Sequence, residues 1–371
     1  MRDVYLFNPD NDLALAYGGD NYTAPPFARQ LERDLATLPM WFATQGAMIL
    51  VPDKKTQQWV NNTALQWNLD VEAITPQELA SVAQARYYPW GWSVALRHKL
   101  MNRGAKEADL PSIEAIEKMR QLSHRRTSIA IHTLLSQVLH TRFSPIPQEF
   151  DTMSGVMQFA RTQPGCYLKS PWSGSGRGIY HVLDASDPYL ENWCRGILKR
   201  QGSILGEVGL SRTTDFAVEF HSQHRVVDVA GYSIFESDFH SQYAHGTVAR
   251  NSLLHNRLTA QCPILDAVTD ALKDILRAMV APHYEGFLGI DMLLYSDDDG
   301  CIKLNPCVEL NLRPTMGIVA STMGNLLTHK GGQGRFVIEH SRQGFHSQEG
   351  HIALTPIDDS TRYRAIIVPN G

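Results

Sequence analysis

The segment 167–182, YLKSPWSGSGRGIYHV, restricts what this chain can fold into more than any other. It begins as a short strand that contains one lysine, Lys169, and then breaks into a turn with glycine at positions 174, 176 and 178. A glycine-rich turn lets the backbone approach a ligand and point successive N–H groups at it, and such turns bind phosphate. Lysine adds a point charge that suits phosphate oxygens. The alternative is a flexible hairpin loop beside a lysine whose stem packs on apolar surface.

Three familiar phosphate-binding motifs are excluded. The chain has no GxxxxGK[ST] segment, which excludes a P-loop. The glycines follow GxGxG rather than GxGxxG and lie far from a first βα turn, which excludes a dinucleotide fingerprint. Protein kinases place lysine after the glycine loop and need HRD and DFG, whereas here Lys169 precedes the loop and both triplets are absent.

A second informative segment begins with two expected strands, at 287–295 and 301–312. They are joined by DDDG at 297–300, which could suggest a calcium loop. An EF-hand is excluded because its first and last ligand positions would be Tyr295 and Pro306. The segment therefore predicts a tight turn between two antiparallel strands.

These two strands carry polar residues within apolar surroundings. Glu309 and Asn311 are two positions apart, so they point to the same face of a strand, and Asp291 lies on the partner strand. Two carboxylates and an amide oxygen form a hard oxygen site that suits Mg²⁺. The alternative is an exposed polar sheet face, but burying isolated acids among apolar neighbours is costly without a cation.

Taken together, the motifs resemble the ATP-grasp superfamily. They are a lysine before a glycine loop, a hinge strand ending in an acid, an Asp strand, and an ExN strand followed by arginine. The resemblance covers roughly residues 113–318. It implies an ATP-grasp fold whose two α+β subdomains close on ATP and Mg²⁺. It also implies an ATP-dependent ligase in which a carboxylate is phosphorylated and an amine or other nucleophile displaces phosphate.

The resemblance also implies a role for each matching residue. Lys169 would contact the α- and β-phosphates, and residues 173–178 would fold over the β- and γ-phosphates as a mobile lid. Glu207 and Val208 would read adenine, and Asp215 would bind the ribose hydroxyls. The expected nucleotide-binding residues are Arg126, Lys169, Ser173, Gly174, Ser175, Gly176, Glu207, Val208 and Asp215. The expected Mg²⁺ ligands are Asp291, Glu309 and Asn311, and the expected catalytic residues are Lys169 and Arg313.

The chain departs from the superfamily pattern at two places. A second lysine usually begins the helix before the glycine loop, and here Arg125 and Arg126 take its place, with either able to face the nucleotide. The spacing between Asp291 and Glu309 is also long. A tight turn at 297–300 would leave them three residues out of register, so we expect a bulge at Asn305-Pro306 to restore the alignment.

The chain length of 371 residues and the order of elements predict an α/β and α+β protein in three parts. Residues 1–110 form a Rossmann-like N-terminal domain, because strands at 3–8 and 47–52 flank a stretch with helical potential. Residues 111–320 form the ATP-grasp domain, and residues 321–371 complete its body. Helices are expected around 113–119, from 131 to about 143, and at 263–280.

The N-terminal part has one candidate for substrate contact. Asn8, Asp10, Asn11 and Asp12 follow the first strand, where open α/β sheets bind ligands. Turn and helix-cap chemistry explains the same residues. Both interpretations stay open at this point.

Composition limits the class of protein. A formal net charge of −4 gives no basic field for nucleic acid, and no apolar run approaches the ~20 residues that span a bilayer. Five scattered cysteines without CxxC spacing fit a reducing cytoplasm. We therefore expect a cytoplasmic protein with small-molecule carboxylate and nucleophile substrates, no nucleic-acid or membrane partner, and an undetermined oligomeric state.

Two other functions share the same nucleotide site. An ATP-grasp kinase would phosphorylate a small-molecule hydroxyl instead of a carboxylate. A non-catalytic nucleotide-binding module would bind ATP without turnover. The sequence does not identify a substrate, because substrate contacts lie on variable loops.

Overall fold

The computed structural model describes residues 1–174, 178–237, 243–327, 333–345 and 349–370. The chain divides into two compact units. Unit 1 contains Met1–Arg120, Ala244–Asn251 and Arg313–Gly371, and unit 2 contains Gln121–Tyr243 and Ser252–Leu312. This grouping does not follow the boundaries expected at residues 110 and 320, and the three-part domain division stays a prediction.

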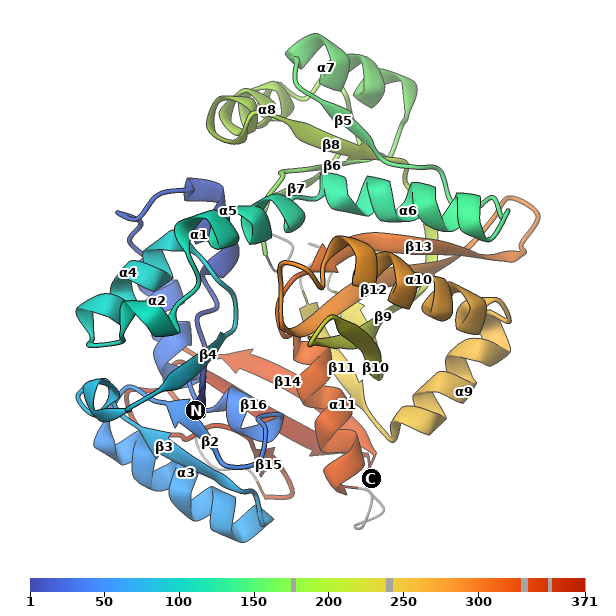
Figure 1. Cartoon of the computed structure of the whole chain (residues 1–371). Helices are drawn as coiled ribbons and strands as arrows, with labels where there is room; N and C mark the ends of the chain where they lie inside the picture. Colours follow the sequence, from blue (N-terminus) through green and yellow to red (C-terminus); the bar gives the residue numbers. More distant parts are fainter. Residues whose placement is uncertain (175–177, 238–242, 328–332, 346–348, 371) are drawn as a thin grey trace. The chain divides into compact units, whose positions relative to one another are not determined.

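Unit 1 begins with a parallel sheet whose strands lie in the order β3-β2-β1-β4 (Figure 1). The strands are β1 (Arg2–Leu6), β2 (Ala47–Leu50), β3 (Val71–Ile74) and β4 (Ala85–Pro89). Val4, Tyr5 and Leu6 are all buried although successive side chains point to opposite faces, so both faces of β1 are covered. The Rossmann-like arrangement expected for the N-terminal part is confirmed.

The helices of this region begin at side-chain caps where the sequence provides them. Asp53 accepts a hydrogen bond from the Thr56 amide at the start of α3, and Ser93 accepts one from the Leu96 amide at the start of α4. The elements are α1 (Asn11–Tyr17), α2 (Pro26–Asp34), η1 (Leu38–Trp41), α3 (Lys54–Trp67), η2 (Leu79–Ser81), α4 (Val94–Asn102), η3 (Glu107–Asp109) and α5 (Ile113–Leu122).

The C-terminal residues of unit 1 pack on its N-terminal residues. The Leu354 carbonyl accepts a hydrogen bond from Trp41 Nε1 (2.9 Å), and Asp34 accepts hydrogen bonds from the amides of Arg362 and Tyr363. Strands β11, β14, β16 and β15 are neighbours in that order, and the pairs among β14, β16 and β15 are antiparallel. The elements are β11 (Tyr243–Val248), α11 (Met316–Leu326), β14 (Gly334–His340), β15 (Ile352–Ala353) and β16 (Tyr363–Pro369).

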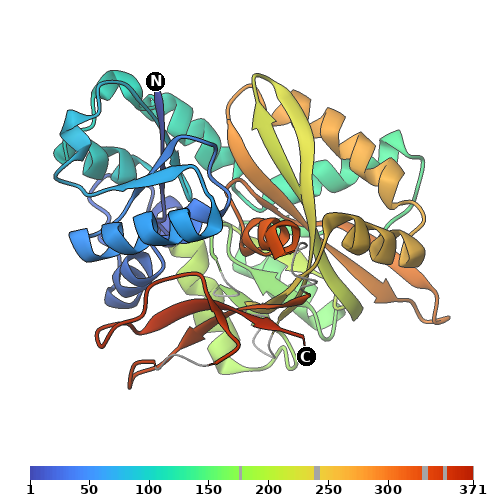
Figure 2. The same ribbon diagram turned by 90° about the horizontal axis from the view of Figure 1, so that it is seen from below.

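Unit 2 contains two groups of antiparallel strands (Figures 1 and 2). The first has the order β5-β8-β6-β7, with β5 (Gln148–Phe150), β6 (Tyr167–Lys169), β7 (Ile179–His181) and β8 (Ile204–Glu207). Helices α7 (Met153–Thr162) and α8 (Pro188–Gln201) pack on it. The second has the order β13-β12-β9-β10, with β9 (Ser211–Gln223), β10 (Val226–Ser237), β12 (Gly286–Ser296) and β13 (Ile302–Asn311).

Three further helices belong wholly or mostly to unit 2, namely α6 (Arg126–Val138), α9 (Asn251–Gln261) and α10 (Leu265–Met279). The apolar stripe predicted for 263–280 is confirmed, since Leu265, Val268 and Leu272 are fully buried. Helix α6 ends five residues earlier than expected. The reason is His140, which has a left-handed φ of 48° and so stops the helix before the prolines are reached.

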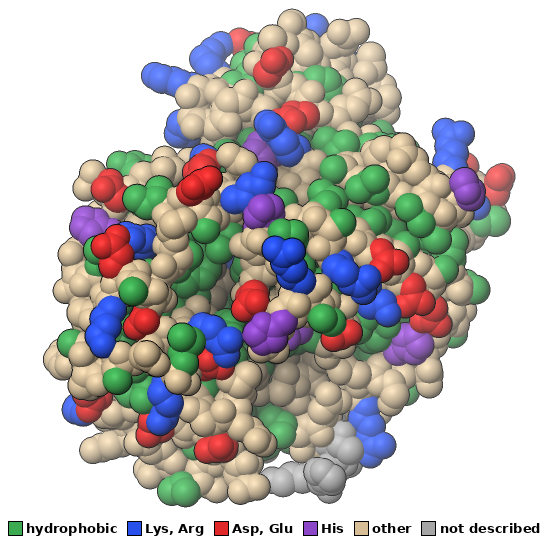
Figure 3. Space-filling view, in the orientation of Figure 1, with side chains coloured by type: hydrophobic (Ala, Val, Ile, Leu, Met, Phe, Trp, Pro, Cys, Tyr) green, Lys and Arg blue, Asp and Glu red, His purple; other side chains and the backbone are tan. Residues whose placement is uncertain are grey.

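Two further findings concern the apolar length of the helices and the distribution of charge on the surface. None of the helices in the described ranges is both long and apolar enough to cross a bilayer. On the face drawn in Figure 3, acidic and basic side chains are interspersed. That mixture agrees with the near-neutral composition.

One histidine is fully enclosed in unit 2. His132 lies on α6 with no exposed surface and makes an edge contact with the Phe143 ring at 6.1 Å between centroids. Burial lowers the pKa of His132 to about 4 from its ordinary value of 6.5. The folded protein therefore holds this side chain neutral over a pH range in which an unfolded chain protonates it.

We predict that this histidine makes unit 2 sensitive to acid. Its contribution to stability is complete above pH 6.5 and is lost as the pH falls toward 4, because the unfolded state binds the extra proton. His132→Phe should remove on the order of 3 kcal/mol of the pH dependence of unfolding free energy. Urea unfolding at several pH values measures it, and the exposed His283→Phe serves as the control. An unchanged pH slope in His132→Phe would contradict the prediction.

Candidate functional site

The lysine that precedes the glycine turn is buried and paired. Lys169 is the last residue of β6, and its Nζ lies 2.6 Å from Oε2 of Glu207, the last residue of β8. The two strands are antiparallel neighbours with Lys169 opposite Leu205, and Glu207 is two residues further along β8 on the same face, within reach of the long lysine side chain. A buried ammonium needs such a partner. Two residues predicted to contact the nucleotide from separate segments therefore lie side by side.

A backbone hydrogen bond joins the described residues on either side of the glycine turn. The Ser170 amide donates to the Gly178 carbonyl at 2.8 Å. Gly178 has a φ of +80°, and a Cβ there would lie 2.3 Å from Ser170 Oγ, so only glycine fits. Ser173 is buried, and Gly174 is half-buried. Ser175 and Gly176 lie outside the described residues, and their phosphate contacts stay predictions.

The turn between β12 and β13 is tight, as expected. The Gly300 amide donates to the Asp297 carbonyl at 3.0 Å, and the Cys301 amide donates to Asp297 Oδ1 at 2.8 Å. The pair of residues nearest the turn is Ser296 on β12 and Ile302 on β13.

The bulge expected at Asn305-Pro306 is confirmed. The register changes between Leu293, opposite Asn305, and Asp291, opposite Glu309. Met292 alone on β12 therefore faces the three residues 306–308 on β13. Proline cannot donate to a ladder, and a bulge accommodates that loss.

The bulge places the three expected Mg²⁺ ligands on one face. Asp291 lies opposite Glu309, and Asn311, two residues further on, lies opposite Gly289. Paired residues share a face, and so do residues two apart. The structure thus brings Asp291, Glu309 and Asn311 together, as the sequence suggested, and their role in binding metal stays a prediction.

The same face carries a carboxylate that the sequence analysis missed. Glu219 on β9 lies opposite Gly289, is 1% exposed, and accepts a hydrogen bond from Ser233 Oγ at 3.1 Å. A signal was available, because Asp215 and Glu219 alternate with apolar residues in DFAVEF. The candidate site therefore extends across β9.

The electrostatic surroundings of Cys307, a buried thiol on β13, indicate that the end of β6 lies near the strands that carry the expected Mg²⁺ ligands. Burial raises the pKa of Cys307, which lies in the bulge. The carboxylates of Asp291, Glu309 and Glu207 raise it further, and Lys169 opposes them. These four charged groups all lie within electrostatic range of one sulfur atom, so we treat them as parts of one candidate site in unit 2.

Arg125 links the two halves of that site. Its Nη1 donates to Ser170 O (2.6 Å) and Ser173 Oγ (2.7 Å), and its Nη2 donates to Ser173 O (3.1 Å). Nη2 also lies 3.0 Å from Oε1 of Glu309. A planar guanidinium suits several oxygens at once. Arg125 therefore joins the base of the glycine turn to a predicted metal ligand.

Arg126 has different surroundings. Its Nη2 lies 2.6 Å from Oε1 of Glu149 on β5, and 58% of its side chain is exposed, against 3% for Arg125. Of the two arginines, Arg125 contacts Glu309 and the turn. Nucleotide binding by Arg126 stays a prediction.

The expected hinge follows β8. Val208 is half-buried immediately after Glu207. Asp215 on β9 pairs with Arg212 at 2.8 Å. Burial raises the pKa of Asp215, and the charges of Arg212 and Lys169 oppose that shift. Asp215 thus lies within electrostatic range of Lys169, and its contact with a ribose stays a prediction.

Arg313 belongs to unit 1. Its Nη2 lies 3.3 Å from Oδ2 of Asp12 on α1. Asp12 therefore makes an ion pair that a role in a turn or a helix cap would not require. The role of Arg313 beside a reacting group stays a prediction.

The donor set fits Mg²⁺ that is shared with a phosphate. Among the described residues, no cluster of three His, Cys, Asp or Glu side chains is arranged to hold a metal by itself. Asp291 and Glu309 supply carboxylates and Asn311 an amide oxygen. Mg²⁺ is typically held by one or two carboxylates together with substrate phosphates and water.

Comparison with known proteins decides the fold. The sequence matches no protein-family model and no curated protein. The structure is similar to the biotin carboxylase–beta-gamma-ATP complex of Campylobacter jejuni, with a TM-score of 0.53, 12% identity, and coverage of 100% of this chain and 87% of that one. The chain has the ATP-grasp fold.

Two further solved structures with the ATP-grasp fold resemble this chain. N5-carboxyaminoimidazole synthetase of Staphylococcus aureus has a TM-score of 0.51 and 10% identity over 100% of this chain and 93% of that one. The biotin carboxylase domain of Hydrogenobacter thermophilus 2-oxoglutarate carboxylase, in complex with MgADP, ADP and bicarbonate, has a TM-score of 0.52 and 11% identity. It is matched over 99% of this chain and 86% of that one. At these identities the similarity establishes the fold.

We predict that the two adjacent arginines differ in their contribution to stability. Arg125→Met leaves Glu309 without its cation and two buried carbonyls without a donor, which should lower the unfolding free energy by about 2–4 kcal/mol. Arg126→Met removes an exposed pair and should cost less than about 1 kcal/mol. Urea unfolding of both variants measures the difference, and equal losses would contradict the assignment of Arg125.

Proposed function

We propose that this protein is an ATP- and Mg²⁺-dependent ligase that joins a carboxylate to an amine or another nucleophile. The observation that carries the proposal is that Arg125 joins Glu309, which lies opposite Asp291, to the glycine turn that follows the Lys169–Glu207 ion pair. Apart from Arg125, these residues are the lysine expected to bind phosphate, the acid expected at the adenine-binding hinge and two carboxylates expected to bind metal, all within one ATP-grasp fold. The similar solved structures, one of them a beta-gamma-ATP complex and another an MgADP complex, support it.

The proposed reaction has two steps. The carboxylate oxygen of one substrate attacks the γ-phosphorus of ATP, forming an acyl-phosphate and releasing ADP. The nucleophile then attacks the acyl carbon, and inorganic phosphate leaves while the nucleophile loses a proton. Most of the catalysis is electrostatic, because charge moves between oxygens during phosphoryl transfer.

The residues have distinct parts in that reaction. Lys169 neutralises phosphate oxygens from the end of β6, and amides of the glycine turn donate to them. Bound Mg²⁺ would neutralise charge on the phosphates, held by Asp291, Glu309 and Asn311. Arg125 holds Glu309 and the base of the turn in place.

Product analysis separates this proposal from the two alternatives. Purified protein is incubated with ATP, Mg²⁺ and a pool of small carboxylates and amines, and ADP and phosphate are measured. A ligase releases both in equal amounts as its product forms. A kinase releases ADP while the phosphoryl group stays on the product, and a binding module releases neither.

We predict that Lys169 contributes directly to ATP affinity. Lys169→Ala should weaken ATP binding by about 1.5–3 kcal/mol, the value of a lost charged hydrogen bond. Calorimetry measures it. The matched control is Lys199→Ala on α8, an exposed lysine of the same unit. Equal ATP affinity in the Lys169 variant and the parent would rule out the phosphate contact.

We also predict that Glu309 binds the cation. Glu309→Gln keeps the side-chain shape but removes the charge, so Mn²⁺ affinity in the presence of an ATP analogue should fall by at least about tenfold. Electron paramagnetic resonance of free Mn²⁺ reports the affinity without turnover. Glu149→Gln also loses an arginine partner but lies outside the metal set, so it should bind Mn²⁺ like the parent. A similar loss in both variants would exclude a specific role for Glu309.

A further inference from the structure

The contact between Arg125 and Glu309 affects how the proposed site can take a metal ion. Nη2 of Arg125 lies 3.0 Å from Oε1 and 3.1 Å from Oε2 of Glu309. One nitrogen at nearly equal distances from both oxygens lies between them, in what we call the chelating position of the carboxylate. A cation held by both oxygens needs that position, and a cation on one oxygen lies close to a like charge. Arg125 and a metal ion therefore compete for Glu309.

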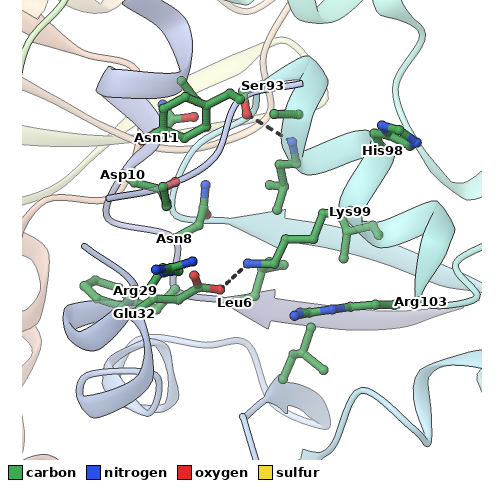
Figure 4. A pocket seen from close by; sticks show the side chains of 18 of the residues that line it. Leu6, Asn8, Asp10, Asn11, Arg29, Glu32, Ser93, His98, Lys99 and Arg103 are labelled. Atoms are coloured by element: carbon green, nitrogen blue, oxygen red, sulfur yellow. Dashed lines mark hydrogen bonds and ion pairs between the residues drawn. The ribbon is translucent and has the colours of Figure 1, made fainter. Parts of the chain in front are cut away.

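An ion pair in unit 1 has a different geometry. A cavity of about 640 Å³ in that unit is lined in part by Lys99 and Glu32 (Figure 4). Lys99 Nζ donates to one oxygen of Glu32, Oε1, at 2.6 Å. The side chains of Glu32 and Glu309 are almost equally exposed, at 24% and 25%. Burial of the acid therefore does not explain the difference. The lysine leaves one oxygen to another partner, whereas Arg125 uses both.

Arg125 is held in place by the base of the glycine turn. Its Nη1 donates to Ser170 O and Ser173 Oγ, and its Nη2 donates to Ser173 O. Its side chain is 3% exposed, whereas the side chain of Glu309 is 25% exposed. A cation from solvent can therefore reach the carboxylate, but it meets a fixed positive charge there.

One donor of the same guanidinium has no acceptor. Nε of Arg125 is buried and makes no hydrogen bond within the described part of the chain. Nη1 and Nη2 are directed at oxygens of Ser170, Ser173 and Glu309. A buried donor without an acceptor is costly, so a further oxygen ligand beside the guanidinium is favoured. Phosphate oxygens match the charge and the planar fork of arginine.

We propose that Arg125 makes metal binding at Glu309 conditional on bound nucleotide. In the protein alone, the guanidinium takes the chelating position of Glu309 and disfavours a cation there. A phosphate group beside Arg125 supplies a further acceptor and negative charge, and the carboxylate becomes available to a cation. Because linkage is reciprocal, the cation in turn strengthens nucleotide binding. The part played by nucleotide rests on the proposed function, whereas the competition between Arg125 and a cation does not.

The charges of the site agree with this role. Asp291 lies opposite Glu309, and with Asn311 they form an oxygen donor set that suits a divalent cation. Arg125 neutralises one of the two carboxylates. A phosphate that pairs with the guanidinium restores negative charge beside the cation. The site therefore favours metal and phosphate together over either one alone.

Mn²⁺ binding without nucleotide tests the competition. Electron paramagnetic resonance of free Mn²⁺ is recorded for the full chain, for Arg125→Met and for Arg125→Gln, which loses the charge but keeps an amide donor for the turn. Circular dichroism establishes which variants are folded. A folded variant should bind Mn²⁺ at least about tenfold more tightly than the parent, because Glu309 is released. Equal or weaker binding in a folded variant would overturn the proposal.

Two further variants make the result specific. Arg125→Met combined with Glu309→Gln should bind Mn²⁺ no more tightly than the parent, which assigns the gain to one carboxylate. Arg195→Met is the matched control, because Arg195 pairs with Glu191 at 2.5 Å on α8 of the same unit, and it should bind Mn²⁺ like the parent. A gain that persists in the double variant, or an equal gain in the control, means a general charge effect and overturns the proposal.

The parent protein tests the part played by nucleotide without any substitution. Mn²⁺ is titrated with and without a nonhydrolysable ATP analogue, and binding to the analogue alone is measured separately and subtracted. The analogue should raise the Mn²⁺ affinity of the protein by at least about tenfold. In the Arg125 variants this increase should be smaller. Equal Mn²⁺ affinity of the parent with and without the analogue contradicts the proposal.

Failure of this inference differs from failure of the proposed function. If product analysis shows ligation but the parent and a folded Arg125 variant bind Mn²⁺ equally, only the inference is overturned. If the gain in Mn²⁺ affinity depends on Glu309 but ATP is neither bound nor turned over, the ligase is overturned and the competition between Arg125 and the cation stands.

Discussion

Glu309 lies opposite Asp291 because β13 has three residues where β12 has one. An unbroken ladder from the turn would place Cys307 opposite Asp291 instead. Since side chains alternate with a period of two, two extra residues change the partner without changing the face. The bulge therefore places the Glu309 carboxylate, instead of the neutral thiol of Cys307, opposite Asp291. The two carboxylates are then paired, and such a pair can hold a cation. Arg125 adds positive charge to this pair through its contact with Glu309.

Arg125 shows how that charge is distributed before any ligand binds. A single guanidinium satisfies Glu309 and two carbonyls at the base of the glycine turn, so strand β13 and the turn share one cation. Lys169 is similarly occupied by Glu207. Each cation and each acid needs its partner, because an unpaired buried charge is costly. Both predicted phosphate-facing groups are therefore held in position by acids of the same site.

The local sequence pattern was enough to predict much of the fold and of the candidate site. The alternation in β12 and β13, the proline at position 306 and the apolar stripe of α10 identified elements, the bulge and the shared face. Pattern could not separate Arg125 from Arg126, because neighbours on a helix point about 100° apart and only packing decides which is buried. Nor could it group the last strands with the first, since the Trp41–Leu354 hydrogen bond joins positions with no local signal in common. Glu219 was visible in the alternation and was overlooked because its neighbours are large and apolar.

The tight turn between β12 and β13 has a practical consequence for labelling the protein. Residues 298–300 are exposed, while buried Leu294 and Leu304 fix the register between the turn and the bulge. Exposed loop tips are the positions where proteins best accept inserted sequence. A short peptide tag or a fluorophore-bearing cysteine could be introduced there, five or more residues along the strand from Asp291. Such a probe would report on unit 2 without touching the residues that define its chemistry.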